Sequence, residues 1–79
     1  MDITYSRTAL RSIKSLDSRV KDRIREGIEG IPYGDIKKIQ GHSDLYRLRI
    51  GGYRVLFEII GNEIYVNDVL PRGQAYKRV

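Results

Sequence analysis

The sequence predicts an α+β domain, a two-helix hairpin packed on one face of a mostly antiparallel four-stranded sheet. In the first third of the chain, apolar residues recur at helical spacing. In the second half, apolar and polar residues alternate, and Gly-Gly or Gly-Asn pairs separate the alternating runs. The resulting element order is β-α-α-β-β-β, followed by a short C-terminal tail or helix. A chain of 79 residues supports one hydrophobic core, so residues 1–79 are expected to form a single domain.

The first strand is expected at residues 3–5, where Ile-Thr-Tyr favours extended backbone. A first helix, capped by Ser6 or Thr8, follows and ends near residue 16. Its apolar residues at helical spacing are Ala9, Leu10, Ile13 and Leu16. A second helix, capped by Asp17 or Ser18, ends before Pro32. The stretch 32–44 is rich in turn-forming residues and is expected to be a loop with room for a short extended segment.

Residues 45–57 form two alternating runs joined by Gly51-Gly52, which predicts a β-hairpin with a two-residue turn. In this register one side of the hairpin is apolar, with the facing pairs Ile50–Tyr53, Leu48–Val55 and Tyr46–Phe57. The other side carries Arg47, Arg49 and Arg54, with Arg49 directly opposite Arg54. Like charges opposite one another destabilise a sheet, so this side is expected to meet an anion.

The last strand is expected at residues 63–70, after a tight turn at Gly61-Asn62, and Pro71 ends it. A strict alternation along this strand would turn Asp68 toward the apolar face. A β-bulge near Asn67 and Asp68 is therefore expected, because a bulge redirects the side chains that follow it.

Composition excludes several classes of function. The chain has no cysteine, which excludes disulfides and thiolate metal sites and favours a reducing compartment, so the protein is expected to be cytoplasmic. No apolar run approaches the roughly 20 residues of a membrane span, and the N-terminus lacks the apolar core of a signal peptide. There is no phosphate-binding glycine loop, paired-carboxylate motif or His/Cys cluster, so no cofactor or metal is expected.

The net charge of +5 and the arginine-bearing side of the hairpin favour a polyanionic partner. The planar fork of arginine suits phosphate, and a tyrosine in the tail can stack on an unpaired base. These patterns are more typical of proteins that bind single-stranded RNA than of proteins that bind the grooves of a duplex. The candidate RNA-binding residues are Arg47, Arg49, Lys37, Lys38 and Lys77. From the residues alone, a landing site for an acidic protein segment remains an equal alternative, and Arg47 and Arg49 also suit the protective charges of a sheet edge.

The runs LYRLRIGGYRVLFEI and LPRGQAYKR resemble the RelE/ParE superfamily of bacterial and archaeal toxins, and the RelE-like members in particular. The resemblance covers nearly the whole chain. It implies the toxin of a type II toxin–antitoxin pair, a ribosome-dependent endoribonuclease that cleaves mRNA in the A site by 2′-hydroxyl attack. The implied partners are a cognate antitoxin, the ribosome and mRNA, with operator DNA bound only through the antitoxin. Two alternatives are a ParE-like inhibitor of DNA gyrase and a non-catalytic homologue that binds an antitoxin.

The same resemblance implies three catalytic residues. Arg54 would stabilise the charge that develops on the scissile phosphate, and Arg72 would act at the leaving oxygen. Tyr76 would stack on a base or orient the attacking 2′-hydroxyl. Arg47 and Arg49 stand where the RelE members carry lysines, and arginine stays protonated, so the general base is left open. No metal is expected, because the arginines supply the positive charge that a cation would otherwise provide.

Overall fold

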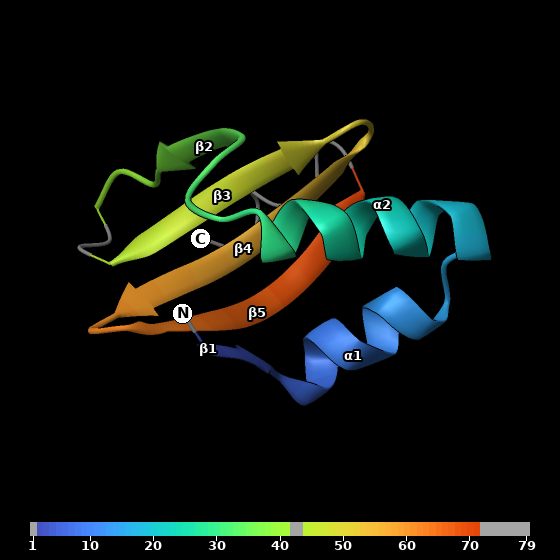
Figure 1. The fold of residues 1–79 in the computed structure, drawn as a ribbon, viewed down its shortest axis with the longest axis horizontal. Coiled ribbons are helices and arrows are strands. Elements are labelled where there is room, and N and C mark those ends of the chain that lie inside the picture. Colours follow the sequence, from blue (N-terminus) through green and yellow to red (C-terminus); the bar gives the residue numbers. More distant parts are fainter. Residues whose placement is uncertain (1, 42–43, 72–79) are drawn as a thin grey trace.

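The computed structural model describes residues 2–41 and 44–71 and has the α+β architecture that the sequence predicts (Figure 1). Its elements in chain order are β1 (Asp2–Tyr5), α1 (Arg7–Lys14), α2 (Ser18–Glu29), β2 (Asp35–Lys38), β3 (Leu45–Ile50), β4 (Tyr53–Ile60) and β5 (Glu63–Pro71). The two helices pack on one face of the sheet, which confirms the predicted helical hairpin.

The sheet has five strands rather than the predicted four, in the order β1-β5-β4-β3-β2. The additional strand is β2, whose residues were expected in a loop with room for a short extended segment. It pairs antiparallel with β3 along the outer edge of the hairpin. The sequence Asp-Ile-Lys-Lys has little apolar pattern of its own, so its extended form depends on the backbone partners that β3 supplies. β1 pairs parallel with β5, and all other pairs are antiparallel, which confirms the mostly antiparallel sheet.

Two polar side chains fix where the helices begin. The Ser6 hydroxyl accepts a hydrogen bond from the Ala9 amide at 3.0 Å and donates one to the Asn67 carbonyl at 2.6 Å, so it both caps α1 and ties it to β5. The Asp17 carboxylate accepts a hydrogen bond from the Val20 amide at 2.9 Å and caps α2. These are the first of the two candidates that the sequence offered for each cap. Each cap satisfies a backbone donor that the first helical turn leaves unpaired.

The hydrophobic core lies between the helices and the sheet. Ala9, Ile24 and Ile28 are fully buried there against Val55 and Phe57. The register of β4 and β5 shifts between Leu56 and Phe57, opposite Asn67, which confirms the predicted bulge. As a result, Val66 and Val69 both enter the core. Within residues 2–41 and 44–71, no helix has the length and apolar character needed to cross a membrane.

Candidate nucleic-acid interface

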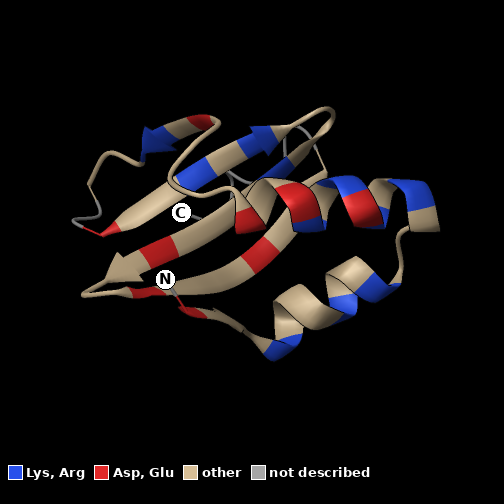
Figure 2. Cartoon of the chain, viewed as in Figure 1, with Lys and Arg blue, Asp and Glu red and all other residues tan. Residues whose placement is uncertain are grey.

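The three hairpin arginines share the sheet face opposite the helices. The register is the predicted one: Arg49 lies opposite Arg54, and Leu48 lies opposite Val55 in the core. β2 adds two residues to this face, because Asp35 pairs with Arg49 and Lys37 pairs with Arg47. We call these five residues the arginine face: Asp35, Lys37, Arg47, Arg49 and Arg54. Figure 2 shows basic residues in blue on β2 and β3, the strands that carry four of these five residues; Arg54 lies on β4.

Lys38 does not join this face. It pairs with Tyr46, whose ring packs against the core and stacks on Phe57 with centroids 5.6 Å apart. By strand alternation, Lys38 therefore projects toward the helix side of the sheet. Among the predicted RNA-binding residues, the structure brings together Lys37, Arg47 and Arg49. The predicted site residues Arg72, Tyr76 and Lys77 lie outside the described residues.

The arginine face is less open than a solvated sheet face. Arg47 and Arg54 retain only 6% and 8% of their accessible surface, whereas the Arg49 side chain is 48% exposed. A second hydrophobic cluster lies on this face, made of Ile39, Leu56 and Leu70 with Leu45 packed against it. Leu56 lies opposite Arg47, and Leu70 lies opposite Arg54, so the aliphatic stems of the arginines have apolar neighbours. Sequence reasoning missed this cluster, although strand alternation already placed Leu56 beside the arginines.

Asp35 links two of the arginines. Arg47 Nη1 donates to the Asp35 backbone oxygen at 3.1 Å and to Oδ1 at 3.3 Å, and Arg49 Nε lies 3.0 Å from Oδ2. Desolvation alone would raise the pKa of the Asp35 carboxyl, but the charges and hydrogen bonds of Arg47 and Arg49 outweigh it and lower that pKa below its ordinary 3.8. No sequence pattern pointed to Asp35, because its contacts with the two arginines depend on the pairing of β2 with β3.

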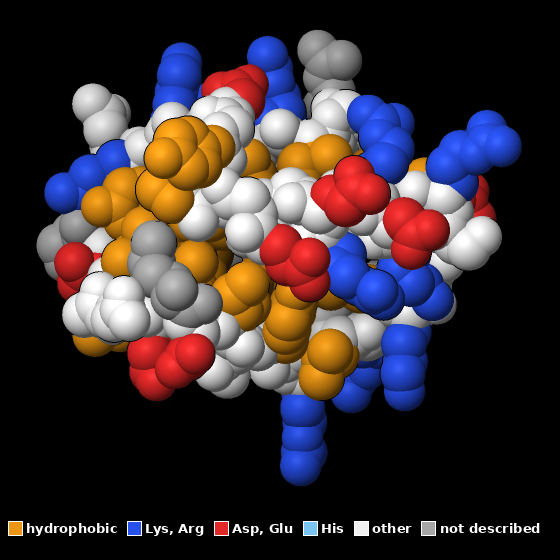
Figure 3. Space-filling model, viewed as in Figure 1, with side chains coloured by type: hydrophobic (Ala, Val, Ile, Leu, Met, Phe, Trp, Pro, Cys, Tyr) orange, Lys and Arg blue, Asp and Glu red, His pale blue; other side chains and the backbone are white. Residues whose placement is uncertain are grey.

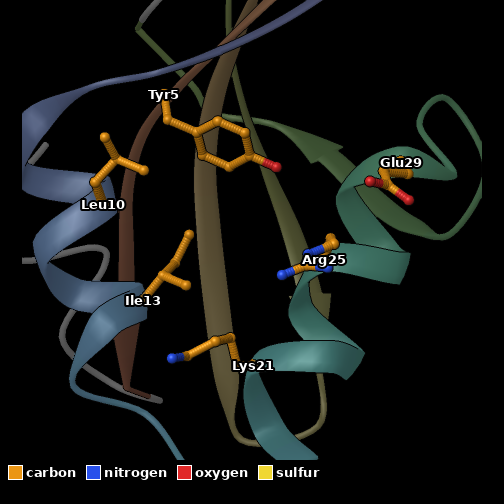
Figure 4. Close-up of a pocket in the computed structure, with 6 residues that line it drawn as sticks. All are labelled: Tyr5, Leu10, Ile13, Lys21, Arg25 and Glu29. Atoms are coloured by element: carbon orange, nitrogen blue, oxygen red, sulfur yellow. The ribbon is translucent and has the colours of Figure 1, made fainter. Parts of the chain in front are cut away.

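The opposite side of the molecule carries a cleft of about 300 Å³ between the two helices, lined by Tyr5, Leu10, Ile13, Lys21, Arg25 and Glu29 (Figure 4). Burial, then the charge of Glu29, raises the pKa of the Tyr5 hydroxyl, and Arg25 partly opposes them. Acidic and basic side chains are mixed over this helical side (Figure 3). It therefore lacks the excess of positive charge that the arginine face carries, with four basic residues and one acidic residue.

Among the residues that the structure describes, no group of three or more His, Cys, Asp or Glu side chains is placed to hold a metal ion. The arginine face presents the guanidinium groups of Arg47, Arg49 and Arg54. Such groups bind phosphate through paired hydrogen bonds and stabilise negative charge that develops on it.

This chain is similar to known toxins of toxin–antitoxin systems both in sequence and in fold. Residues 3–76 match the family model of the ParE toxin of the type II toxin–antitoxin system parDE. Toxin RelE3 of Methanocaldococcus jannaschii is 31% identical, with 96% of each chain covered. The fold superposes with a TM-score of 0.79 on a chain of the RelB–RelE antitoxin–toxin complex from Methanococcus jannaschii, 29% identical, covering 95% of this chain and 96% of that one. The archaeal RelE–RelB complex from Pyrococcus horikoshii OT3 gives a TM-score of 0.75 and 27% identity, with 94% and 97% covered.

Proposed function

Because the chain belongs to the RelE/ParE superfamily of toxins from type II toxin–antitoxin systems, we propose that it is a ribosome-dependent endoribonuclease that cleaves mRNA in the A site. The observation that carries this proposal is the pairing of Arg49 with Arg54 on the sheet face away from the helices. Two guanidinium groups on one face suit a bound phosphate, because each can contact it through paired hydrogen bonds.

In the proposed reaction, the 2′-hydroxyl of the RNA attacks the adjacent phosphate. Its oxygen forms the new bond to phosphorus while the bond to the 5′ oxygen breaks. The 2′-hydroxyl loses a proton, and the leaving 5′ oxygen gains one. Arg54 is nearly buried and lies opposite Leu70, and at a buried position a positive charge stabilises the developing negative charge more strongly than in water.

Arg72 at the leaving oxygen and Tyr76 at the base or the 2′-hydroxyl complete the proposed catalytic set. Lys37 and Lys77 are proposed to add contacts to the RNA backbone, with Lys37 on the same face as the arginines. Lys38, which was also expected to bind RNA, is left out of the proposed contacts because it projects toward the helix side of the sheet. No residue is assigned as general base, because arginine stays protonated at every accessible pH.

The proposed regulator is a cognate antitoxin. Two of the structural neighbours are toxin chains in RelB–RelE complexes, which supports a partner of that kind for this chain. An antitoxin that covers the arginine face would present carboxylates to it, and operator DNA would be bound only through the antitoxin. Because the proposed reaction takes place on ribosomes, the protein is proposed to act in the cytoplasm.

The experiment that tests this function combines purified protein, ribosomes and a defined mRNA, with cleavage mapped by primer extension. We expect cuts at A-site codons that require the ribosome. Removing a preorganised charge-stabilising donor costs on the order of 100-fold or more in rate, so Arg54→Ala should reduce cleavage by at least that factor. Because Arg54 is buried, Arg54→Lys serves as a second variant that keeps the charge and loses the fork.

Lys14→Ala is the matched control, since it removes one positive charge from the last turn of α1, on the helix side. It should leave cleavage unchanged. Full cleavage by a folded Arg54→Ala protein would refute the site assignment. If the folded wild-type protein does not cleave, a gyrase supercoiling assay would separate a ParE-like inhibitor, which the ParE family match favours, from a non-catalytic homologue.

A further inference from the structure

Asp35 begins β2 and lies directly opposite Arg49 on β3. Its two carboxylate oxygens are divided between two arginines: Oδ1 faces Arg47 Nη1 at 3.3 Å, and Oδ2 faces Arg49 Nε at 3.0 Å. Its backbone oxygen makes a further contact with Arg47 Nη1 at 3.1 Å. One acidic residue therefore links two cations of the neighbouring strand.

The two arginines are held differently. The Arg47 side chain is only 7% exposed, and it contacts both the backbone and the carboxylate of Asp35. Arg47 is therefore placed to anchor Asp35 rather than to contact a ligand. The Arg49 side chain is 48% exposed and meets Asp35 through Nε. A contact through Nε leaves the outer Nη edge of the guanidinium for an anion, the edge that binds phosphate in a two-pronged geometry.

We propose that Asp35 is a positioning residue, which holds the exposed guanidinium of Arg49 beside Arg54 with its Nη edge toward the substrate phosphate. This inference rests on the proposed RNA cleavage. Arg49 and Arg54 repel each other across the strand pair, and a long arginine side chain has many rotamers in solvent. The carboxylate of Asp35 offsets the repulsion and restricts Arg49 before the RNA arrives. Preorganisation of this kind strengthens binding by lowering its ordering cost.

A positioning role and a purely electrostatic role of Asp35 predict opposite changes in KM for Asp35→Asn. Asp35→Asn makes the face more positive, so a screening role for Asp35 predicts tighter RNA binding and a lower KM. Positioning predicts the opposite. Immobilising one rotamer-rich side chain changes an affinity by roughly two- to tenfold, so the KM for ribosome-bound mRNA should rise about fivefold. The value of kcat should stay within about twofold, because Asp35 acts before the chemical step.

The kinetic test compares wild type, Asp35→Asn, Asp35→Glu and the matched control Asp22→Asn. Asp22 is an exposed acid on α2, so its replacement makes the same change in net charge away from the arginine face. We expect Asp35→Glu to recover part of the lost affinity and Asp22→Asn to leave KM unchanged or slightly lower. A KM for Asp35→Asn that matches Asp22→Asn would overturn the proposal. A large loss in kcat with unchanged KM would also overturn it, because it would place Asp35 in the chemistry itself.

A second measurement does not depend on cleavage. The Nε–H signal of Arg49, assigned by its loss in Arg49→Lys, can be followed by NMR in the ¹⁵N-labelled protein. We expect an ordered, slowly exchanging signal in wild type that becomes mobile and fast-exchanging in Asp35→Asn. An unchanged signal would overturn the proposal. If wild type does not cleave RNA, the proposed function fails while this signal still decides whether Asp35 holds Arg49.

Discussion

Gly27 sets how closely α2 approaches the hairpin that carries the arginine face. A Cβ atom at this position would lie 2.4 Å from Ile50 Cδ1 and 3.0 Å from Ile50 Cγ1. Optimal contacts between carbon atoms are about 3.5–4.0 Å, so Gly27→Ala requires the Ile50 side chain to move by about 1 Å or more. The next atom, Leu48 Cδ2, would be at 3.6 Å, which is an ordinary contact.

Two opposing effects determine the magnitude. Replacing glycine by alanine inside a helix stabilises it by about 1 kcal/mol. Overpacking a well-packed site typically costs about 1–3 kcal/mol. We therefore expect Gly27→Ala to lower the free energy of unfolding by about 1 kcal/mol. In an Ile50→Ala background both close atoms are gone, so the same change should raise the free energy of unfolding by about 1 kcal/mol. The coupling between the two positions is then about 2 kcal/mol.

Urea unfolding of the wild type, the two single variants and the double variant measures this coupling as a double-mutant cycle. Gly52→Ala is the control: its Cβ would meet no heavy atom within 4 Å, and Gly52 has no positive φ. It should stabilise the protein slightly, by about 0.4–1 kcal/mol, through the unfolded chain. An equal effect of Gly27→Ala in both backgrounds would refute the close approach of α2 to β3.

Two further predictions concern the free energy of unfolding: its dependence on the hairpin turn and its decrease at acid pH. Gly51 has φ +56°, so Gly51→Ala should cost about 1–2 kcal/mol in the free energy of unfolding, and no loss in urea unfolding would contradict this. The pKa of Asp35 is lowered in the folded protein, so its ion pairs contribute stability above pH 3.8 that is lost as the pH falls through the folded-state pKa. NMR titration of the carboxyl carbon should give a midpoint below 3.8 that rises in Arg49→Ala, and a wild-type midpoint at or above 3.8 would rule this out.

Local patterns in the sequence were enough to predict the hairpin and its register. The alternation on either side of Gly51-Gly52 left one register that buries Leu48 and Val55, and the structure has that register. The bulge was also predictable, because without it Asp68 would occupy the place that Val69 takes in the core. For each helix, the sequence offered two candidate N-cap residues, chosen because Ser, Thr and Asp side chains accept hydrogen bonds from backbone amides, and the structure has one of the two.

The features that sequence patterns did not predict depend on contacts between distant segments. β2 is a strand because β3 offers it backbone partners and because Asp35 meets Arg47 and Arg49. The contacts of Arg47 with Asp35 depend on the same pairing, so strand alternation alone could not predict them. The second cluster around Leu56 and Leu70 was different: both leucines lay on the predicted arginine face and could have been recognised there.

Arg49 and Arg54 differ in exposure, and this difference would give them different roles toward the phosphate that they are proposed to bind. Arg54 is nearly buried, so its charge acts through a medium of lower dielectric but reaches few solvent-facing positions. Arg49 is half exposed and reaches outward, but its long side chain needs a partner to hold it. Asp35 supplies that partner from the adjacent strand, and Arg47 fixes Asp35 in turn. The additional strand β2 is therefore part of the proposed site, because it carries the carboxylate that is proposed to order the exposed arginine.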